Sequence, residues 1–298
     1  MSRIQDILAR AERDGTARRT QSGESDYAAV QTVDYAAQSV DGSSALNPSP
    51  FTQAPFMPPM DPAPAPLPGP TQVATVSAAP AAIEGRTAHA TLHPALVSAI
   101  APHSPAAERY RAIRSRITQH EDHAPLRTVM VTSPGDGECK SVTAANLALA
   151  MAQEFQRRVV LVDADLRGPS VHALFGLEGG PGLAEVLAGE ATLDDALVYL
   201  PDYRLTVLPA GATPEYPTEL LGSAGMRRAM DTLRARFDRV LLDLPAVAPL
   251  ADVGTVAPLA DGVVMVVRAG VTQRPALDQA LAALEDSKVL GVVLNETR

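Results

Sequence analysis

Short apolar runs alternate with amphipathic stretches over the last two thirds of the chain. The apolar runs are rich in valine and leucine, which is typical of buried strands, and the amphipathic stretches repeat their apolar positions at helical spacing. The predicted strands are 128–133, 158–162, 205–209, 239–242, 262–268 and 289–294. The predicted helices are 92–100, 104–119, 142–154, 183–188, 225–236, 252–260 and 274–286.

This order of elements predicts an α/β fold with a mostly parallel sheet flanked by helices. Strands that are apolar on both faces need helices on each side of the sheet, and parallel strands need a helical connection between them. Ligands of such sheets bind beyond the carboxyl ends of the strands. Polar residues that directly follow a predicted strand are therefore the first candidates for a functional site.

The first 86 residues lack this alternation. Residues 1–19 predict a short amphipathic helix that docks on its own protein or contacts a membrane surface or a partner. Residues 20–86 predict a disordered linker rich in proline, alanine and serine, with ten prolines between positions 48 and 70. Such a segment cannot bury enough apolar surface to offset its ordering entropy. The folded domain is therefore expected over 87–298.

Composition narrows the class of protein. The 298 residues include 46% hydrophobic residues, as in an ordinary globular protein, but no tryptophan and a single cysteine. One cysteine excludes an internal disulfide and fits a reducing compartment. The net charge of −9 argues against nucleic-acid binding as the main role. Without a long apolar run or the apolar core of a signal peptide, we expect a cytoplasmic protein.

The stretch 128–154 joins a predicted strand to a predicted helix through the turn Pro-Gly-Asp-Gly-Glu-Cys-Lys-Ser. A glycine-rich turn of this kind surrounds phosphates with backbone N–H groups and the positive end of a helix dipole. Lys140 would reach the β and γ oxygens, and the Ser141 hydroxyl would hold Mg²⁺. The candidate phosphate-binding residues are Gly135, Asp136, Gly137, Glu138, Cys139, Lys140, Ser141 and Val142.

Cys139 departs from the usual pattern G-x-x-x-x-G-K-[ST], which has glycine before the lysine. A side chain there hinders close approach of the backbone to phosphate. A Gly-Asp-Gly turn between a strand and a helix could also be a plain connection. A partly exposed thiol at a helix N-terminus could have a lowered pKa and be oxidisable, which makes redox control a hypothesis.

Aspartates follow two further predicted strands. Asp163 and Asp165 come after the apolar run Val-Val-Leu-Val, and Asp243 comes after Val-Leu-Leu. Magnesium nucleotides need hard oxygen ligands near the phosphates, usually one or two carboxylates with water. An aspartate is also a common strand terminator, so each alone is ambiguous. Together with the turn, they predict a nucleotide site at one edge of the sheet, with Ser141, Asp163 and Asp243 as candidate metal ligands.

Residues 87–298 carry a Walker A turn (PGDGECKS), a Walker A′ stretch (VVLVDADLRGPS) and a Walker B strand (RVLLDLP). They also contain LTVLPAG, ADGVVMVVRAG and KVLGVVLN, and the spacing Glu-x-x-Arg-x-x-Arg at Glu108, Arg111 and Arg114. This set resembles the bacterial tyrosine kinases (BY-kinases) of the capsular exopolysaccharide family. These kinases are P-loop ATPases related to the septum-site and partitioning ATPases.

The resemblance implies binding of ATP and Mg²⁺ and transfer of the γ-phosphoryl group to tyrosines. It implies that Lys140 neutralises phosphate charge, that Asp163 or Asp165 orients or deprotonates the phenol, and that Asn295 contacts the base. It further implies a ring-like homo-oligomer through Glu108, Arg111 and Arg114. The implied activator is a membrane polysaccharide co-polymerase or chain-length regulator, which would recruit the protein to the inner face of the cell membrane.

Three functions remain open from the sequence. The first is an ATP-dependent tyrosine autokinase that regulates polymerisation and export of an extracellular polysaccharide, with Tyr27 and Tyr35 as accessible acceptors. The second is a degenerate, nucleotide-binding scaffold, because Cys139 interrupts the turn and no tyrosine cluster ends the chain. The third is a partitioning-type ATPase, which the Walker A′ stretch and the Glu-x-x-Arg-x-x-Arg helix disfavour.

Overall fold

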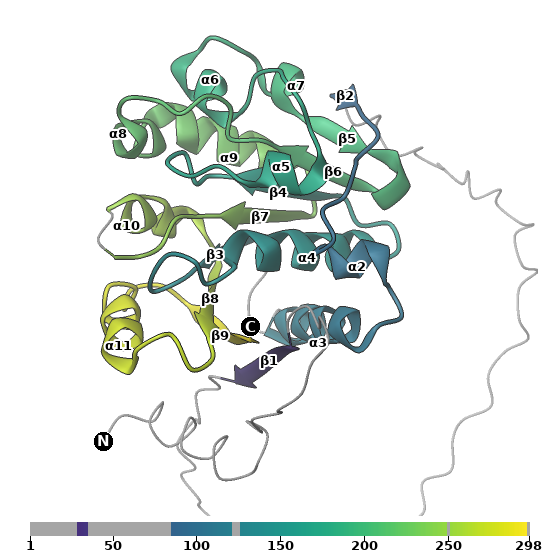
Figure 1. Ribbon diagram of the computed structural model, residues 1–298. Coiled ribbons are helices and arrows are strands. Elements are labelled where there is room, and N and C mark those ends of the chain that lie inside the picture. The colour runs from purple at the N-terminus through teal and green to yellow at the C-terminus, as the bar shows by residue number, and fades with distance from the viewer. Residues whose placement is uncertain (1–28, 35–84, 121–125, 249–250, 297–298) are drawn as a thin grey trace, which may run out of the picture. The chain divides into compact units, whose positions relative to one another are not determined.

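A computed structural model describes residues 29–34, 85–120, 126–248 and 251–296. In this part of the chain, nine strands form one sheet in the order β1-β9-β8-β3-β7-β4-β6-β5-β2 (Figure 1). The strands are β1 (Ala29–Asp34), β2 (Arg86–Thr87), β3 (Thr128–Thr132), β4 (Val159–Asp163), β5 (Val198–Leu200), β6 (Leu205–Leu208), β7 (Arg239–Asp243), β8 (Gly262–Arg268) and β9 (Val289–Glu296).

The sheet is mostly parallel, as predicted. Strands β9, β8, β3, β7, β4 and β6 run in one direction, and β1 and β5 pair antiparallel to their neighbours β9 and β6. All residues of β3, β4, β6 and β7 are buried. The apolar runs of the sequence are therefore central strands covered on both faces, as their composition requires.

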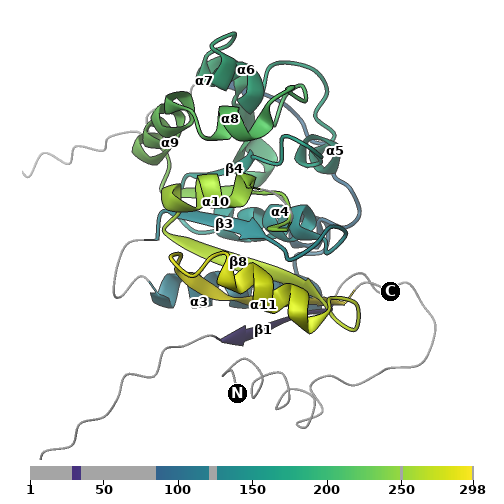
Figure 2. The same cartoon turned by 90° about the vertical axis from the view of Figure 1, so that its left-hand side faces the viewer.

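Helices cover both faces of the sheet (Figures 1 and 2). One face carries α2 (Val97–Ile100), α3 (Pro105–Gln119), α4 (Lys140–Ala152) and α5 (Val171–Phe175). The other carries α6 (Leu183–Ala188), α7 (Leu193–Ala196), α8 (Pro217–Leu221), α9 (Ala224–Arg236), α10 (Asp252–Val256) and α11 (Arg274–Ala282). Val129 and Val131 of β3 face the first layer and Met130 faces the second, because side chains alternate along a strand.

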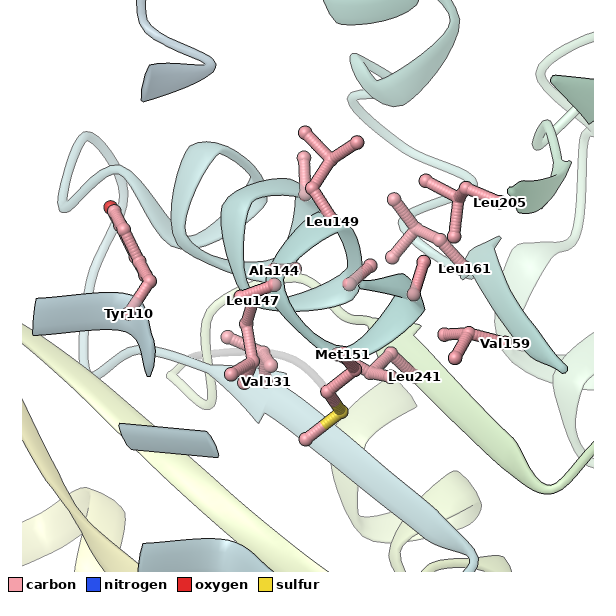
Figure 3. Packing of buried hydrophobic residues seen from close by; sticks show 14 of the residues in the cluster. Tyr110, Val131, Ala144, Leu147, Leu149, Met151, Val159, Leu161, Leu205 and Leu241 are labelled. Carbon is pink, nitrogen blue, oxygen red and sulfur yellow. The ribbon is translucent and has the colours of Figure 1, made fainter. Parts of the chain in front are cut away.

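Helix α4 is the centre of the first layer. Its alanine-rich sequence brings the helix close to the sheet, and Leu147 and Met151 pack beside Val131 and Leu241 (Figure 3). Tyr110 of α3 is also fully buried in this layer. The tight packing fixes the first turn of α4, and hence Lys140 and Ser141, relative to the ends of the central strands.

Most predicted elements are confirmed within one or two residues, but three helices are shorter than expected. The helix expected over 274–286 ends at Ala282. The helix expected over 92–100 is reduced to α2, because Pro94 disfavours helical backbone at the residue before it. The helix expected over 252–260 ends at Val256 and continues as the 3₁₀ turn η3 (Ala257–Leu259). Pro258 lacks the N–H group that an α-helix would need there.

Strand β1 lies inside the range 20–86, for which the sequence predicts a linker. It pairs with the edge strand β9 from Ala29 opposite Glu296 to Asp34 opposite Gly291. An edge strand offers unpaired backbone groups, and the segment Ala-Val-Gln-Thr-Val-Asp is rich in β-branched residues. The rest of the range expected to be a linker, residues 20–28 and 35–84, and the helix expected over 1–19 lie outside the described residues.

Candidate functional site

The glycine-rich turn lies between β3 and α4, at the carboxyl edge of the sheet. The Thr132 hydroxyl donates to the Pro245 carbonyl at 2.6 Å, and the Ser133 hydroxyl donates to the Gly135 carbonyl at 2.6 Å. These bonds hold the start of the turn against the segment after β7. The turn ends at the first residue of a 13-residue helix, whose N-terminus favours an anion.

Two residues of the turn have left-handed backbone conformation. Gly137 has φ +75° and Cys139 has φ +61°. Glycine adopts this conformation freely, but a residue with a Cβ does so at a cost. The left-handed backbone explains why glycine is usual before the lysine. Cys139 adopts the same conformation at the cost of backbone strain.

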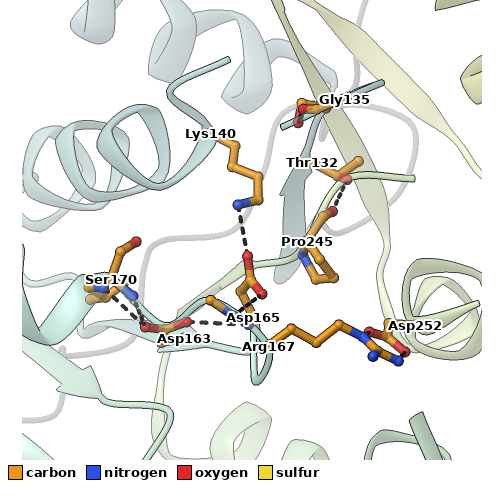
Figure 4. Close-up of polar contacts among 12 residues, drawn as sticks. Thr132, Gly135, Lys140, Asp163, Asp165, Arg167, Ser170, Pro245 and Asp252 are labelled. Atoms are coloured by element: carbon orange, nitrogen blue, oxygen red, sulfur yellow. Dashed lines mark hydrogen bonds and ion pairs between the residues drawn. The ribbon is translucent and has the colours of Figure 1, made fainter. Parts of the chain in front are cut away.

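Lys140 and Asp165 form the central ion pair of the site. The Lys140 ammonium lies 2.8 Å from the Asp165 carboxylate, and both side chains are largely buried (Figure 4). Burial by itself would lower the pKa of Lys140, but the bond to Asp165 and the charges of Asp243, Asp165 and Asp136 outweigh it, so that pKa is raised. The lysine is therefore a cation held at the strand ends, available to a phosphate that displaces the carboxylate.

Asp163 is held by backbone donors. It ends β4, and its carboxylate accepts N–H groups from Ser170 at 3.1 Å, Val171 at 3.0 Å and Asp165 at 3.2 Å. Burial raises the pKa of Asp163 to about 7, although these hydrogen bonds oppose the shift. Figure 4 shows Ser170 beside this carboxylate.

Asp243 is a buried carboxylate that accepts no hydrogen bond of good geometry in the described part of the chain. It ends β7 opposite Asp163, is fully buried, and neither of its oxygens accepts a hydrogen bond among the described residues. Burial raises its pKa well above the ordinary value, and the charge of Asp163 raises it further. The Ser141 hydroxyl and Lys140 act in the opposite direction.

These side chains fit a magnesium ion that is held mainly by phosphates and water. The orphaned oxygens of Asp243, the adjacent Asp163 and the Ser141 hydroxyl are hard oxygen ligands of the kind that Mg²⁺ prefers. Within the described residues, no group of three or more His, Cys, Asp or Glu side chains could hold a metal by itself. The site is thus typical of a nucleotide-borne ion rather than of a cage made only of protein ligands.

Arg167 links the segment after Asp165 to the rest of the site, and the sequence did not indicate its partners. It forms a bidentate ion pair with Asp252 of α10 at 2.6 Å and 3.2 Å, and it donates to Thr218 of α8 at 3.0 Å. Thr218 also donates to Asp252. The contacts join residues 51 and 85 positions from Arg167, so only the assembled fold reveals them. They tie the loop that carries Asp165 to two helices.

Glu138 and Asn295 close the site on the β8–β9 side. The Asn295 side chain is buried and donates to the Glu138 carbonyl at 3.4 Å. Its amide oxygen has no partner among the described residues. The base contact expected of Asn295 stays a prediction. Glu138 is buried against Thr272, Gly135 and Arg268, and burial raises the pKa of its carboxyl. Asp136, in contrast, is exposed and Val142 is half-buried.

The Cys139 thiol is not activated. Burial raises its pKa, and the attraction of Arg268 and a hydrogen bond with Asn295 only reduce the shift. The lowered pKa that the sequence suggested is therefore wrong. The physical reason is that half-burial disfavours the thiolate more than the start of α4 and these neighbours favour it.

The three residues expected to mediate self-association lie on α3. Arg111 contacts Glu108 at 2.6 Å and the Pro102 carbonyl at 2.5 Å. Arg114 donates to the Ala150 carbonyl at 2.7 Å and lies 3.3 Å from Glu154. Both arginines thus bind within their own chain, and their role between copies stays a prediction.

The strand–turn–helix unit and the carboxylates at the strand ends define a P-loop NTPase. A family model described as "ParA: NUBPL iron-transfer P-loop NTPase" matches residues 126–194. The chain is 38% identical over 196 residues to the tyrosine-protein kinase YwqD of Bacillus subtilis, covering 65% of this chain and 82% of that one. The chain therefore belongs to the bacterial tyrosine-protein kinase family, as its motifs predicted.

Other similar proteins agree with this assignment. The chain is 36% identical over 202 residues to the succinoglycan biosynthesis transport protein ExoP of Rhizobium meliloti, of which it spans only 26%. Among solved structures, the chimeric protein CapA2B2 matches with a TM-score of 0.65 and 31% identity, over 70% of this chain and 92% of that one. The kinase domain of the Escherichia coli tyrosine kinase ETK matches with a TM-score of 0.66 and 25% identity, over 70% and 83%.

None of the helices in the described ranges is long and apolar enough to cross a lipid bilayer.

Proposed function

We propose that this protein is an ATP-dependent protein-tyrosine autokinase that regulates polymerisation and export of an extracellular polysaccharide. The observation that carries the proposal is the convergence of Lys140, Asp163, Asp165 and the orphaned Asp243 at the carboxyl edge of β3, β4 and β7. The similarity to kinases, and to a protein named for succinoglycan transport, supports both the reaction and the pathway.

The residues of the site would divide the work of phosphoryl transfer. Lys140 leaves its ion pair with Asp165 and binds the β and γ phosphates instead. The N-terminus of α4 and the turn bind the same phosphates. Ser141, Asp163 and Asp243 would hold Mg²⁺, which neutralises charge on the phosphates. Asp165, released from Lys140, orients the tyrosine hydroxyl and accepts its proton. Most of the rate enhancement comes from positioning and charge neutralisation, because the protein forms no covalent bond to the phosphoryl group.

A scaffold that binds nucleotide weakly is the second candidate, and one observation favours it. Cys139 is a non-glycine residue in left-handed conformation directly before Lys140. Its Cβ occupies space where glycine lets the backbone approach phosphate. In this case, the protein would act by binding a membrane polysaccharide co-polymerase, at the inner face of the cell membrane, without transferring phosphate.

A phosphotyrosine assay distinguishes the two functions. Purified protein is incubated with ATP and Mg²⁺, with and without the cytosolic tail of the membrane partner, and blotted for phosphotyrosine. Wild type should be labelled, whereas Lys140→Met should not, because the β and γ phosphates then lose the ammonium group that positions them. Asp243→Asn keeps the size of the side chain and should lose the magnesium dependence of ATP binding together with the label.

Cys139→Gly in the same assay separates the reasons for a negative result. If Cys139→Gly is phosphorylated on tyrosine but wild type is not, then Cys139 alone prevents phosphoryl transfer at an otherwise competent site. That result would support the scaffold function for the wild-type protein. Absence of label from both proteins, although both bind ATP and Mg²⁺ in calorimetry, would refute the kinase proposal.

A further inference from the structure

A cavity of about 590 Å³ lies at the carboxyl end of β6, next to the last strands of the sheet, β5 and β2. This volume is within the range of binding sites for small molecules. One wall is formed by residues between 86 and 91, and another is the loop 176–180 that follows α5. None of the residues that line the cavity belongs to the candidate phosphate site, and the proposed kinase mechanism uses none of them.

Two glycines of the loop let the walls of the cavity approach each other closely. Gly176 has φ +62°, and a Cβ there would lie 2.7 Å from the Thr91 carbonyl oxygen. Gly180 has φ +100°, and a Cβ there would lie 2.3 Å from the Arg86 guanidinium. All four residues line the cavity. The Arg86 side chain therefore rests on a surface that only glycine provides.

The Arg86 guanidinium favours an anionic group in the cavity. It donates to the Gly179 carbonyl at 3.3 and 3.4 Å and has further N–H groups to offer a ligand. A planar guanidinium matches the geometry of phosphate and carboxylate groups. His172 of α5 also lines the cavity and is exposed, so its ring can donate to the same anion. His89 is already paired with Asp202 at 3.2 Å and adds little net charge.

The other polar groups of the cavity favour hydroxyl groups. Glu178 repels a ligand that is anionic throughout, but its carboxylate accepts hydrogen bonds from hydroxyls, and the hydroxyls of Thr87 and Thr91 both donate and accept. No phenylalanine, tyrosine or tryptophan is among the described residues that line the cavity, so a nucleobase finds no such ring on which to stack. A small molecule with one anionic group and several hydroxyls therefore fits better than a nucleotide.

Helix α5 connects the cavity to the candidate functional site. His172 lines the cavity, and the N–H group of the preceding residue, Val171, binds the Asp163 carboxylate at 3.0 Å. A ligand that holds His172 can therefore act on the segment that holds Asp163.

We propose that this cavity binds a sugar phosphate. The phosphate group pairs with Arg86 and His172, and the sugar hydroxyls bind Glu178, Thr87 and Thr91. The purpose of this site rests on the proposed function, because a kinase that regulates polymerisation of a polysaccharide would gain a signal from the supply of phosphorylated sugars. The binding itself does not depend on that function.

Calorimetry with the full-length protein tests the inference. The titrants are glucose 1-phosphate, galactose 1-phosphate and mannose 1-phosphate, with glucose and inorganic phosphate as controls. At least one sugar phosphate should bind at millimolar concentration or below, and about tenfold more tightly than inorganic phosphate, because the hydroxyls add hydrogen bonds. Glucose, which lacks the anion, should give no measurable heat.

Variants assign this binding to the cavity. Arg86→Gln should weaken it about tenfold or more, because a hydrogen bond to a charged group is lost. Gly180→Ala should weaken it as well, because the added Cβ displaces the guanidinium. Gly189→Ala is the matched control, since Gly189 has φ +80°, lies outside the cavity and has no atom within 4 Å of an added Cβ. This control, and Lys140→Met at the phosphate site, should each alter binding less than about twofold.

Thermal unfolding of each variant separates loss of binding from loss of folding. Absence of binding by all three sugar phosphates, or equal affinity for inorganic phosphate, would overturn the inference. A loss in Lys140→Met but not in Arg86→Gln would overturn it too, because the ligand would then occupy the phosphate site. Equal losses in Gly180→Ala and Gly189→Ala would do the same, because backbone strain alone would explain them.

The kinase proposal fails separately from this inference. A protein that binds a sugar phosphate through Arg86 but never forms phosphotyrosine refutes only the kinase proposal. A protein that forms phosphotyrosine but binds none of the three sugar phosphates refutes only the sugar phosphate site.

Discussion

Replacing Cys139 by glycine should stabilise the protein and tighten nucleotide binding. Cys139 is the residue before α4 and has φ +61° and ψ +34°, the left-handed conformation. This conformation costs a residue with a Cβ about 1–2 kcal/mol. Glycine pays nothing there, but it makes the unfolded chain more flexible, at a cost of about 0.5–1 kcal/mol. The net gain is therefore on the order of 1 kcal/mol.

Cys139→Ala is the matched control for this prediction. Alanine also removes the sulfur and its half-buried surface, but it keeps the Cβ and thus the strain. The difference between the glycine and alanine variants isolates the backbone term. For a folded part of this size, about 1 kcal/mol corresponds to roughly 2–4 °C in the midpoint of thermal unfolding.

Denaturant titration and calorimetry with ADP and Mg²⁺ provide the measurements. The glycine variant should be the more stable of the two and should bind nucleotide more tightly, because its backbone can approach the phosphates. Equal stability of the glycine and alanine variants would show that the strain at this position is no larger than the entropy cost of glycine, about 0.5–1 kcal/mol. Equal nucleotide affinity of wild type and the glycine variant would show that the cysteine does not obstruct the turn.

The other predictions concern the aspartates. Burial raises the pKa of Asp163 in the folded protein to about 7 from an ordinary value of 3.8. Well below pH 3.8 the carboxyl is protonated in both states. As the pH rises from there toward 7, the unfolded state ionises first, so the folded state loses stability. In EDTA, the stability of Asp163→Asn relative to wild type should thus grow between pH 4 and 7, by at most about 4 kcal/mol because Asp243 shares the titration. If the difference in stability between Asp163→Asn and wild type does not change with pH, the pKa of Asp163 is not raised in the folded protein. For the Arg167–Asp252 pair, Asp252→Asn should cost about 1–2 kcal/mol in denaturant titration. The cost is at the low end for an ion pair because the Arg167 side chain is 40% exposed. Asp252→Asn should also weaken ATP binding, because the loop that carries Asp165 is then held less firmly. An unchanged affinity for ATP would show that the Arg167–Asp252 pair contributes only to stability.

The sequence determined the local elements and the edge of the sheet where the site lies. Strand β3, the turn and helix α4 follow from an apolar run, glycines and a helical pattern within one stretch of chain. Asp163 and Asp243 could be assigned to the same edge because parallel strands end on the same side. These inferences need only neighbours in the sequence and the direction of strands, and the structure confirms both.

Only the tertiary structure decided which groups meet and how far they are removed from water. The insertion of β7 between β3 and β4 places Asp243 opposite Asp163. That placement, and the burial that raises both pKa values, depend on packing between distant segments. The same holds for the Arg167–Asp252 pair. The left-handed backbone of Cys139 is set by the turn as a whole. Such properties arise from long-range contacts, which no local pattern of residues encodes.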